Sequence, residues 1–260
     1  MPDALLERER AFWDDHYGPP GIYGYEITED TFRDAITPAY EKGGSPGGLT
    51  HRRAWDLLMA EGVDGKRVLD YACGNGGWGL RLAQLGADVT GFDLSPVGVD
   101  NARRQAEFNG LEARFDVADA RRLPYETDSF DVCVGIGALH HVVKYGGASW
   151  ELNRVMRPGG LVVFTEVLGQ NPLIELARKV TMRGEEDAGD VLLTDEHLAA
   201  WGTPFKEWTV EPYSLTFMLK RLFPRRHRLL RACHSFDTVL LREFPFLARY
   251  CGECVIVGRI

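Results

Sequence analysis

Short apolar segments alternate with amphipathic stretches between residues 67 and 167. The apolar segments are RVLDYA (67–72), DVTGFDL (88–94), ARFDVAD (113–119), FDVCVGI (130–136) and LVVFTEV (161–167). The stretches between them that have helical spacing are 79–85, 96–109 and 149–156. Runs of four to seven apolar or β-branched residues, each followed by a helix, are typical of a parallel sheet with βαβ crossovers. The pattern therefore predicts an α/β fold with helices on both faces of an open sheet.

The first fifty residues do not follow this alternation. They are rich in Gly, Pro and aromatic residues, as in FWDDHYGPPGIYGYE and EKGGSPGGLT. We expect one helix over residues 4–14 and loops at the Gly/Pro clusters. Helical periodicity returns over 51–60. We therefore predict an N-terminal cap or lid over residues 1–50.

The alternation also ends after Val167. Helices and loops are expected over 171–207 and 219–250, and strands over 208–218 and 253–260. The aromatic and apolar side chains between residues 171 and 250 suit a cover over a hydrophobic or aromatic substrate. We predict one domain over 51–260, in which 171–250 include this substrate-covering insertion after the fifth strand.

Length, composition and charge exclude some classes of protein. The chain has 260 residues, 45% of them hydrophobic and 26% charged, which suits one α/β domain with added elements. Its net charge of −8 argues against general nucleic-acid binding, which needs a surplus of Lys and Arg. Residues 220–231 carry six Lys or Arg, which we interpret as a solvated helix face.

The cysteines give no sign of a metal site or a disulfide framework. Five are scattered along the chain, and Cys251 and Cys254 form a CxxC pair beside the last apolar strand. No second pair completes a zinc site, so we expect no metal. The N-terminus lacks an apolar signal segment, and no run approaches the length of a membrane span. We expect a cytoplasmic protein without a membrane partner.

A glycine-rich turn follows the first predicted strand, in VLDYACGNGGWG (68–79). Gly74, Gly76 and Gly79 match the GxGxxG pattern, which suits a dinucleotide or S-adenosylmethionine. Asp70 beside the turn discriminates between these two kinds of cofactor. Its carboxylate would repel a pyrophosphate but stabilise the sulfonium and ammonium groups of S-adenosylmethionine. The turn therefore favours S-adenosylmethionine.

Two further aspartates stand at the ends of successive predicted strands. Asp93, in GFDLSP, has two acceptor oxygens that suit the two hydroxyls of a ribose. Asp119, in VADARRLP, would accept a hydrogen bond from the adenine amino group. Each aspartate alone would serve equally well as a helix cap. Three acids on the ligand side of one sheet favour a cofactor site.

These motifs resemble those of class I S-adenosylmethionine-dependent methyltransferases. The resemblance lies in VLDYACGNGGWGLRLA, GFDLSP, DARRLPYETDSFDVCVGIGALHHV and the RPGG at 157–160, and it covers about residues 50–170. It is greatest to the branch called type 11, which includes many small-molecule methyltransferases. The resemblance implies a Rossmann-like, mostly parallel sheet of seven strands. Its last strand is antiparallel, as the late ECVIVGRI segment suggests.

The resemblance also implies a role for each motif residue. It assigns Asp70, Gly74 and Gly76 to the methionine end of the cofactor, Asp93 and Leu94 to the ribose, and Asp119 and Ala120 to the adenine. Ala72 and Gly135 join this cofactor-binding set. Tyr17 and Tyr23, in the aromatic N-terminal segment, are candidates to bond the cofactor carboxylate or the substrate, although plain packing is an alternative for both.

Candidate catalytic residues follow the fourth and fifth strands. His140 and His141 stand in GIGALHHV, and a histidine is a suitable general base for a hydroxyl. Glu166, in VVFTEV, would orient such a histidine or take the proton itself. The resemblance to sugar and natural-product O-methyltransferases implies the same roles. The sequence does not rank the two histidines, and one of them would serve equally in packing or cofactor contact.

The sequence therefore predicts a methyltransferase that acts on a small molecule, at a hydroxyl group of a secondary metabolite. One alternative is methylation of carbon or nitrogen, on a quinone-like ring or an amine. A second is a protein that uses the cofactor structurally, for cyclisation or binding. No Asn-Pro-Pro-aromatic motif follows the fourth strand, which argues against a nucleic-acid base as the acceptor. The sequence leaves the oligomeric state open.

Overall fold

A seven-stranded sheet forms the centre of the structure, a computed structural model that describes residues 2–18, 24–42, 44–45, 47–171, 191–217 and 226–260. The strands are β1 (Arg67–Tyr71), β2 (Asp88–Asp93), β3 (Arg114–Val117), β4 (Phe130–Ile136), β5 (Met156–Val167), β6 (Glu207–Tyr213) and β7 (Glu253–Arg259). Their order in the sheet is β3-β2-β1-β4-β5-β7-β6. Strand β7 runs antiparallel to β5 and β6 on its two sides, and the other neighbouring pairs are parallel. The predicted mostly parallel sheet with an antiparallel last strand is confirmed.

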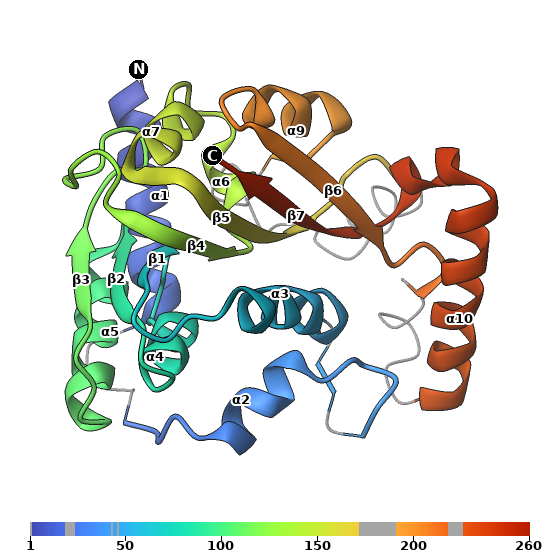
Figure 1. Cartoon of the computed structure of the whole chain (residues 1–260), viewed down its shortest axis with the longest axis horizontal. Helices are drawn as coiled ribbons and strands as arrows, with labels where there is room; N and C mark the ends of the chain where they lie inside the picture. The colour runs from blue at the N-terminus through green and yellow to red at the C-terminus, as the bar shows by residue number, and fades with distance from the viewer. Residues whose placement is uncertain (1, 19–23, 43, 46, 172–190, 218–225) are drawn as a thin grey trace.

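Helices cover both faces of this sheet (Figure 1). In chain order they are α1 (Pro2–Tyr17), α2 (Glu29–Ile36), α3 (Gly48–Glu61), α4 (Gly77–Ala83), α5 (Pro96–Phe108), α6 (Leu139–Val142), α7 (Ala148–Val155), α9 (Asp195–Gly202), α10 (His227–Glu243) and the 3-10 helix η2 (Pro245–Tyr250). Helices α3, α4 and α5 lie on one face and α6, α7 and α9 on the other, while α10 stands at the β6 end. Within the described ranges, no helix is long and apolar enough to cross a bilayer.

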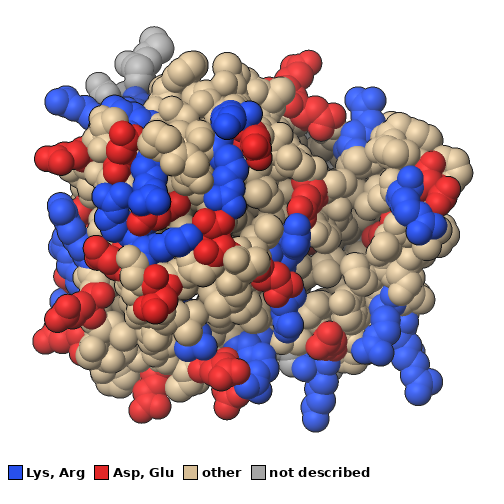
Figure 2. Space-filling view, in the orientation of Figure 1, with Lys and Arg blue, Asp and Glu red and all other residues tan. Residues whose placement is uncertain are grey.

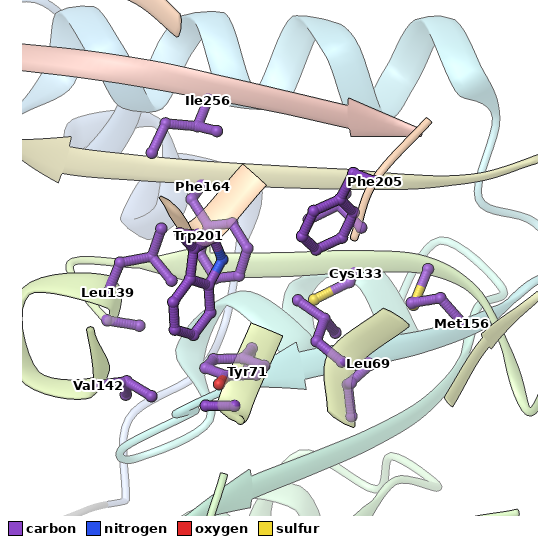
Figure 3. Close-up of a cluster of buried hydrophobic side chains, with 14 of the residues drawn as sticks. Leu69, Tyr71, Cys133, Leu139, Val142, Met156, Phe164, Trp201, Phe205 and Ile256 are labelled. Atoms are coloured by element: carbon purple, nitrogen blue, oxygen red, sulfur yellow. The ribbon is translucent and has the colours of Figure 1, made fainter. Parts of the chain in front are cut away.

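Alternation along the central strands divides the core between the two faces. Leu69 and Tyr71 of β1 point to the same side as Phe164 of β5 and Trp201 of α9 (Figure 3). Val68, which directly precedes Leu69, packs in the opposite layer with α3 and α4. Each fully buried large apolar side chain contributes about 1.5–3 kcal/mol. This two-sided burial explains why the strands have nearly continuous apolar sequences.

Some predicted elements differ from the structure. Helix α2 falls in a segment that we expected to be loops. Thr28 forms a capping box with Thr31, and Phe32 packs on Trp55 and Trp78, so capping and tertiary contacts stabilise it. The strand expected over 208–218 ends at Tyr213, because Ser214 has a left-handed φ of 64°.

Candidate functional site

The turn between β1 and α4 has left-handed backbone at three positions. Ala72, Gly74 and Gly76 have φ values of 52°, 51° and 79°. A Cβ on Gly76 would also lie 2.9 Å from the Cβ of Ala102. Glycine is therefore required at residue 76 both for its φ and for close packing on α5. The left-handed φ of Ala72 is unfavourable for an alanine, and residues at ligand sites often have such strained backbone conformations.

Asp93 connects the end of β2 to this turn through hydrogen bonds. Its carboxylate accepts hydrogen bonds from the backbone N–H of Gly74 and of Ser95, each at 2.9 Å. The side chain is buried, and burial raises the pKa of Asp93 above its ordinary value. The predicted ribose-binding carboxylate is thus held rigidly at the carboxyl end of its strand.

Asp70 is the second buried carboxyl group beside the turn. It accepts a hydrogen bond from the backbone N–H of Gly79 at 2.9 Å. Burial, together with the charge of Asp93, raises the pKa of Asp70 to about 7. No described Lys or Arg is among the groups that shift the pKa of either Asp70 or Asp93. Two buried acids with no Lys or Arg to compensate them fit a cationic ligand such as S-adenosylmethionine.

The raised pKa of Asp70 predicts a specific pH dependence of stability. The folded chain keeps the Asp70 proton up to about pH 7, whereas the unfolded chain loses it near pH 3.8. Asp70 therefore lowers the free energy of unfolding progressively as pH rises from about 4 to about 7. Asp70→Asn has no titrating group at this position. As pH rises through this window, its unfolding free energy should therefore increase relative to that of wild type, and the difference should level off above it.

Thermal unfolding of wild type and Asp70→Asn at several pH values, without cofactor, measures this difference. Asp88→Asn removes an exposed carboxylate at the other end of β2 and serves as the control. Parallel stability curves for wild type and Asp70→Asn would show that Asp70 is ionised over the whole range.

A cavity of about 270 Å³ opens beside these residues, near the carboxyl ends of β1, β2 and β4. This volume is close to the lower limit for small-molecule pockets, about 300 Å³. The predicted site residues that line the cavity are Tyr17, Ala72, Asp93, Leu94, Asp119, Ala120 and His141. Residues from five separate parts of the chain thus meet at one cavity.

The other predicted site residues that the structure describes do not line the cavity. Gly74 and Gly76 shape the turn behind it, and Asp70 bonds to the start of α4. A Cβ on Gly135 would lie 2.3 Å from the Phe164 ring, so this glycine makes room for the neighbouring strand. Tyr23 lies outside the described residues. Cofactor contact by these residues stays a prediction.

Asp119 has a partner that the sequence did not suggest. Arg121 Nη2 donates to Asp119 Oδ2 at 2.6 Å, and the backbone N–H of Arg121 donates to Oδ1 at 2.9 Å. The guanidinium also lies 5.4 Å from the centre of the Tyr145 ring. Arg121 therefore occupies acceptor positions on the carboxylate that we assigned to adenine. The D-x-R spacing is the only sequence sign of this pair.

His140 and Glu166 form a hydrogen-bonded pair next to the cavity. His140 Nδ1 lies 2.8 Å from Glu166 Oε2, and the backbone N–H of Leu139 donates to Glu166 Oε1 at 2.5 Å. The Glu166 side chain is fully buried. A buried carboxylate accepts the Nδ1 proton, which leaves the lone pair on Nε2. The structure thus brings together the histidine and the acid that the sequence proposed.

His141 has a different environment from His140. It lines the cavity, packs edge-on against Trp13 at 4.8 Å, and its Nδ1 lies 3.6 Å from Glu9 Oε1. The two histidine rings are 4.0 Å apart. The structure therefore separates the histidines that the sequence could not rank: His140 binds the acid of β5, and His141 faces the cavity and α1.

Glu9 of α1 is a cavity residue that the sequence did not indicate. It is only 3% exposed, accepts a hydrogen bond from the Tyr145 hydroxyl at 2.5 Å, and lies 3.3 Å from Lys144 Nζ. These partners are more than 130 residues away in the chain, so no local pattern connects them. Glu9 anchors α1 as one wall of the cavity.

Replacing Glu9 with alanine should therefore loosen α1. The change removes a buried acceptor from Tyr145 and an ion-pair partner from Lys144, and we expect a loss of about 1–3 kcal/mol in unfolding free energy. Urea unfolding measures the loss. Glu7→Ala, on an exposed position of the same helix, should change stability by less than about 0.5 kcal/mol. Equal effects of the two changes would contradict the anchoring role.

The described part of the chain contains no group of three or more His, Cys, Asp and Glu side chains placed to hold a metal ion.

Residues 68–160 match the family model of a methyltransferase domain. The chain is 31% identical over 165 residues to a phthiotriol/phenolphthiotriol dimycocerosates methyltransferase of Mycobacterium ulcerans, covering 63% of this chain and 55% of that protein. It is 41% identical over 117 residues to a demethylmenaquinone methyltransferase of Thermus thermophilus, covering 44% and 52%. A fatty-acid O-methyltransferase of Mycolicibacterium smegmatis is 37% identical over 106 residues, covering 40% and 38%.

The chain thus spans about half the length, or less, of these curated relatives. Among solved structures it resembles the [4+2]-cyclase SpnF, with a TM-score of 0.56 and 22% identity over 98% of this chain and 93% of that one. At this identity the likeness concerns the fold alone.

Proposed function

Because the chain carries a class I S-adenosylmethionine-dependent methyltransferase domain, we propose that it methylates a hydroxyl group of a small apolar molecule. The observation that carries the proposal is the His140–Glu166 pair, with 2.8 Å between His140 Nδ1 and Glu166 Oε2, beside a cavity that Asp93 lines. A hydroxyl nucleophile must lose its proton during methyl transfer, and this pair suits that task.

The chain's own residues would position the cofactor. Asp93 presents a rigid carboxylate toward the cavity and would accept the ribose hydroxyls, while Leu94 and Ala120 would contact the adenosine. Bound S-adenosylmethionine supplies a methyl group on a positively charged sulfur. Burial raises the pKa of both Asp70 and Asp93, and a cation in the cavity would favour their ionised forms.

His140 is our proposed general base, and Glu166 orients it. The carboxylate holds the proton on Nδ1, so Nε2 would take the proton from the acceptor hydroxyl. The same carboxylate would then stabilise the imidazolium that forms. His141, which lines the cavity, would instead position the cofactor and acceptor. Because Glu166 is fully buried and also bonds Leu139, it stays fixed while His140 changes charge.

Residues 1–50 are proposed to cap the cavity. Leu6, Glu9, Trp13 and Tyr17 of α1 line one wall, and Asp14 accepts a hydrogen bond from the Ser95 hydroxyl next to β2. Such a cover excludes water from the transfer site. In the same way, we propose that the insertion over 171–250, of which 172–190 and 218–225 lie outside the described residues, covers the acceptor. Its apolar side chains, and the lipid, quinone and fatty-acid names of the relatives, support an apolar acceptor.

The test is a reaction with methyl-labelled S-adenosylmethionine and three kinds of acceptor: long-chain hydroxyl or carboxyl compounds, naphthoquinone-like rings and amines. We expect S-adenosylhomocysteine to form together with an oxygen-bound labelled methyl. Label on a ring carbon or on nitrogen would replace the proposal by the carbon or nitrogen alternative. A changed acceptor with unconsumed cofactor would instead favour the cyclase alternative.

A further inference from the structure

One exposed face of α10 is apolar. Leu229, Phe236 and Val239 follow each other at spacings of seven and three residues, so they share one side of the helix. They are 42%, 55% and 50% exposed. Leu230 and Cys233, on the neighbouring side, are buried against the protein. Helix α10 thus has exposed apolar side chains in addition to those that are buried against the protein.

The 3-10 helix η2 extends this apolar surface. Phe244 lies between α10 and η2 and is 49% exposed. Phe246 lies within η2 and is 67% exposed. We refer to the following residues as the α10 patch: Leu229, Phe236, Val239, Phe244 and Phe246. Exposed apolar groups that gather in this way usually mark a binding surface.

The charged side chains around the patch are mostly of one sign. Over residues 226–250, the exposed charged residues are Arg226, Arg228, Arg231, Arg242, Glu243 and Arg249. The chain as a whole has a net charge of −8, so this positive edge opposes the average. In Figure 2 the edge formed by α10 is largely tan, with blue side chains at its lower end and a blue side chain beside a red one higher up. Arg228 is eleven residues from Val239 and so shares its side of α10, whereas Arg231 is two residues from Leu229 and its guanidinium lies 5.8 Å from the centre of the Tyr40 ring.

We propose that the α10 patch docks on an anionic lipid surface. A helix with exposed Phe, Leu and Val on one side and arginines beside them lies in the interface of a bilayer, with the apolar groups among the acyl chains and the cations at the headgroups. This revises two expectations from the sequence, a solvated basic helix and no membrane partner. It goes beyond the proposed function, because docking needs neither cofactor nor acceptor.

A second copy of the chain fits the patch less well. Two copies related by a twofold axis would bring the same surface together, so arginines around one patch would face arginines around the other. Like charges brought together in this way are repulsive. Anionic headgroups instead complement every arginine at once. The sign of the charges therefore favours lipid over self-association.

Co-sedimentation of the full chain with vesicles tests the proposal. We expect binding to phosphatidylcholine–phosphatidylglycerol vesicles at low salt and weaker binding to pure phosphatidylcholine. Phe236→Ser with Phe246→Ser should reduce partitioning at least ten-fold. Arg228→Gln should reduce binding to the anionic vesicles about five-fold, since one basic residue near the surface contributes about that factor.

Phe108→Ser is the matched control, because Phe108 is 56% exposed but lies on α5, away from α10. It should bind vesicles as wild type does. Thermal unfolding and cofactor titration should be unchanged in all these variants, which keeps a failure of docking distinct from a failure of the proposed function. Wild-type binding no stronger than that of the double Phe variant would overturn the proposal. Sedimentation equilibrium that shows a dimer lost in Phe236→Ser, without vesicle binding, would assign the patch to a second copy.

Discussion

His140→Ala should lower the rate of methyl transfer to a hydroxyl acceptor by about 10²–10⁴-fold, the usual contribution of a general base. The imidazole is held by Glu166, with 2.8 Å between His140 Nδ1 and Glu166 Oε2, so the substitution removes the base that this carboxylate orients. The affinity for S-adenosylmethionine should change little, because His140 does not line the cavity. Single-turnover kinetics and calorimetric titration measure these two quantities separately.

Two further variants control this prediction. Glu166→Gln should lower the rate less than His140→Ala, because the imidazole remains but loses the charge that orients it. His141→Ala should mainly weaken cofactor binding, since His141 faces the cavity. A His140→Ala protein that keeps wild-type turnover while His141→Ala loses it would assign the base to His141.

Asp93→Ala should weaken cofactor binding by at least about 100-fold. The carboxylate would accept two hydrogen bonds from the ribose, and hydrogen bonds to charged groups contribute about 1.5–3 kcal/mol each. It also holds the turn through Gly74 and the start of α5 through Ser95, so the cavity wall loses its shape as well. Calorimetric titration with S-adenosylhomocysteine measures the loss without turnover.

Asp93→Asn keeps the size of the side chain and one acceptor oxygen, and it should lie between wild type and Asp93→Ala. Asp88→Ala, at the opposite, exposed end of β2, should bind as wild type does. A folded Asp93→Ala protein whose affinity lies within two-fold of wild type would remove Asp93 from the cofactor site.

The central sheet was predictable because its strands are buried on both faces. Val68 and Leu69 pack on opposite layers, so β1 is apolar at consecutive positions and stands out from the amphipathic helices around it. Helix α2 was not predictable in the same way. Its capping box at Thr28 lies within a Gly/Pro-rich segment, and its packing depends on Trp55 and Trp78, which belong to later elements.

The candidate site was predictable where its residues follow strands. Asp93 and Glu166 stand at or near strand ends, and the parallel sheet brings such ends to one edge. Glu9 was missed because its contacts with Lys144 and Tyr145 join distant parts of the chain. The two histidines could not be ranked because adjacent residues on a short helix point in different directions, which only the structure of α6 reveals.

The most direct test of the whole account is a calorimetric titration of the full chain with S-adenosylmethionine and, separately, with a nicotinamide dinucleotide. Because its buried carboxyl groups favour a cationic ligand, the chain should bind S-adenosylmethionine in a one-to-one ratio. The titration with the dinucleotide should release little or no heat. Binding of the dinucleotide, with none of S-adenosylmethionine, would contradict the account.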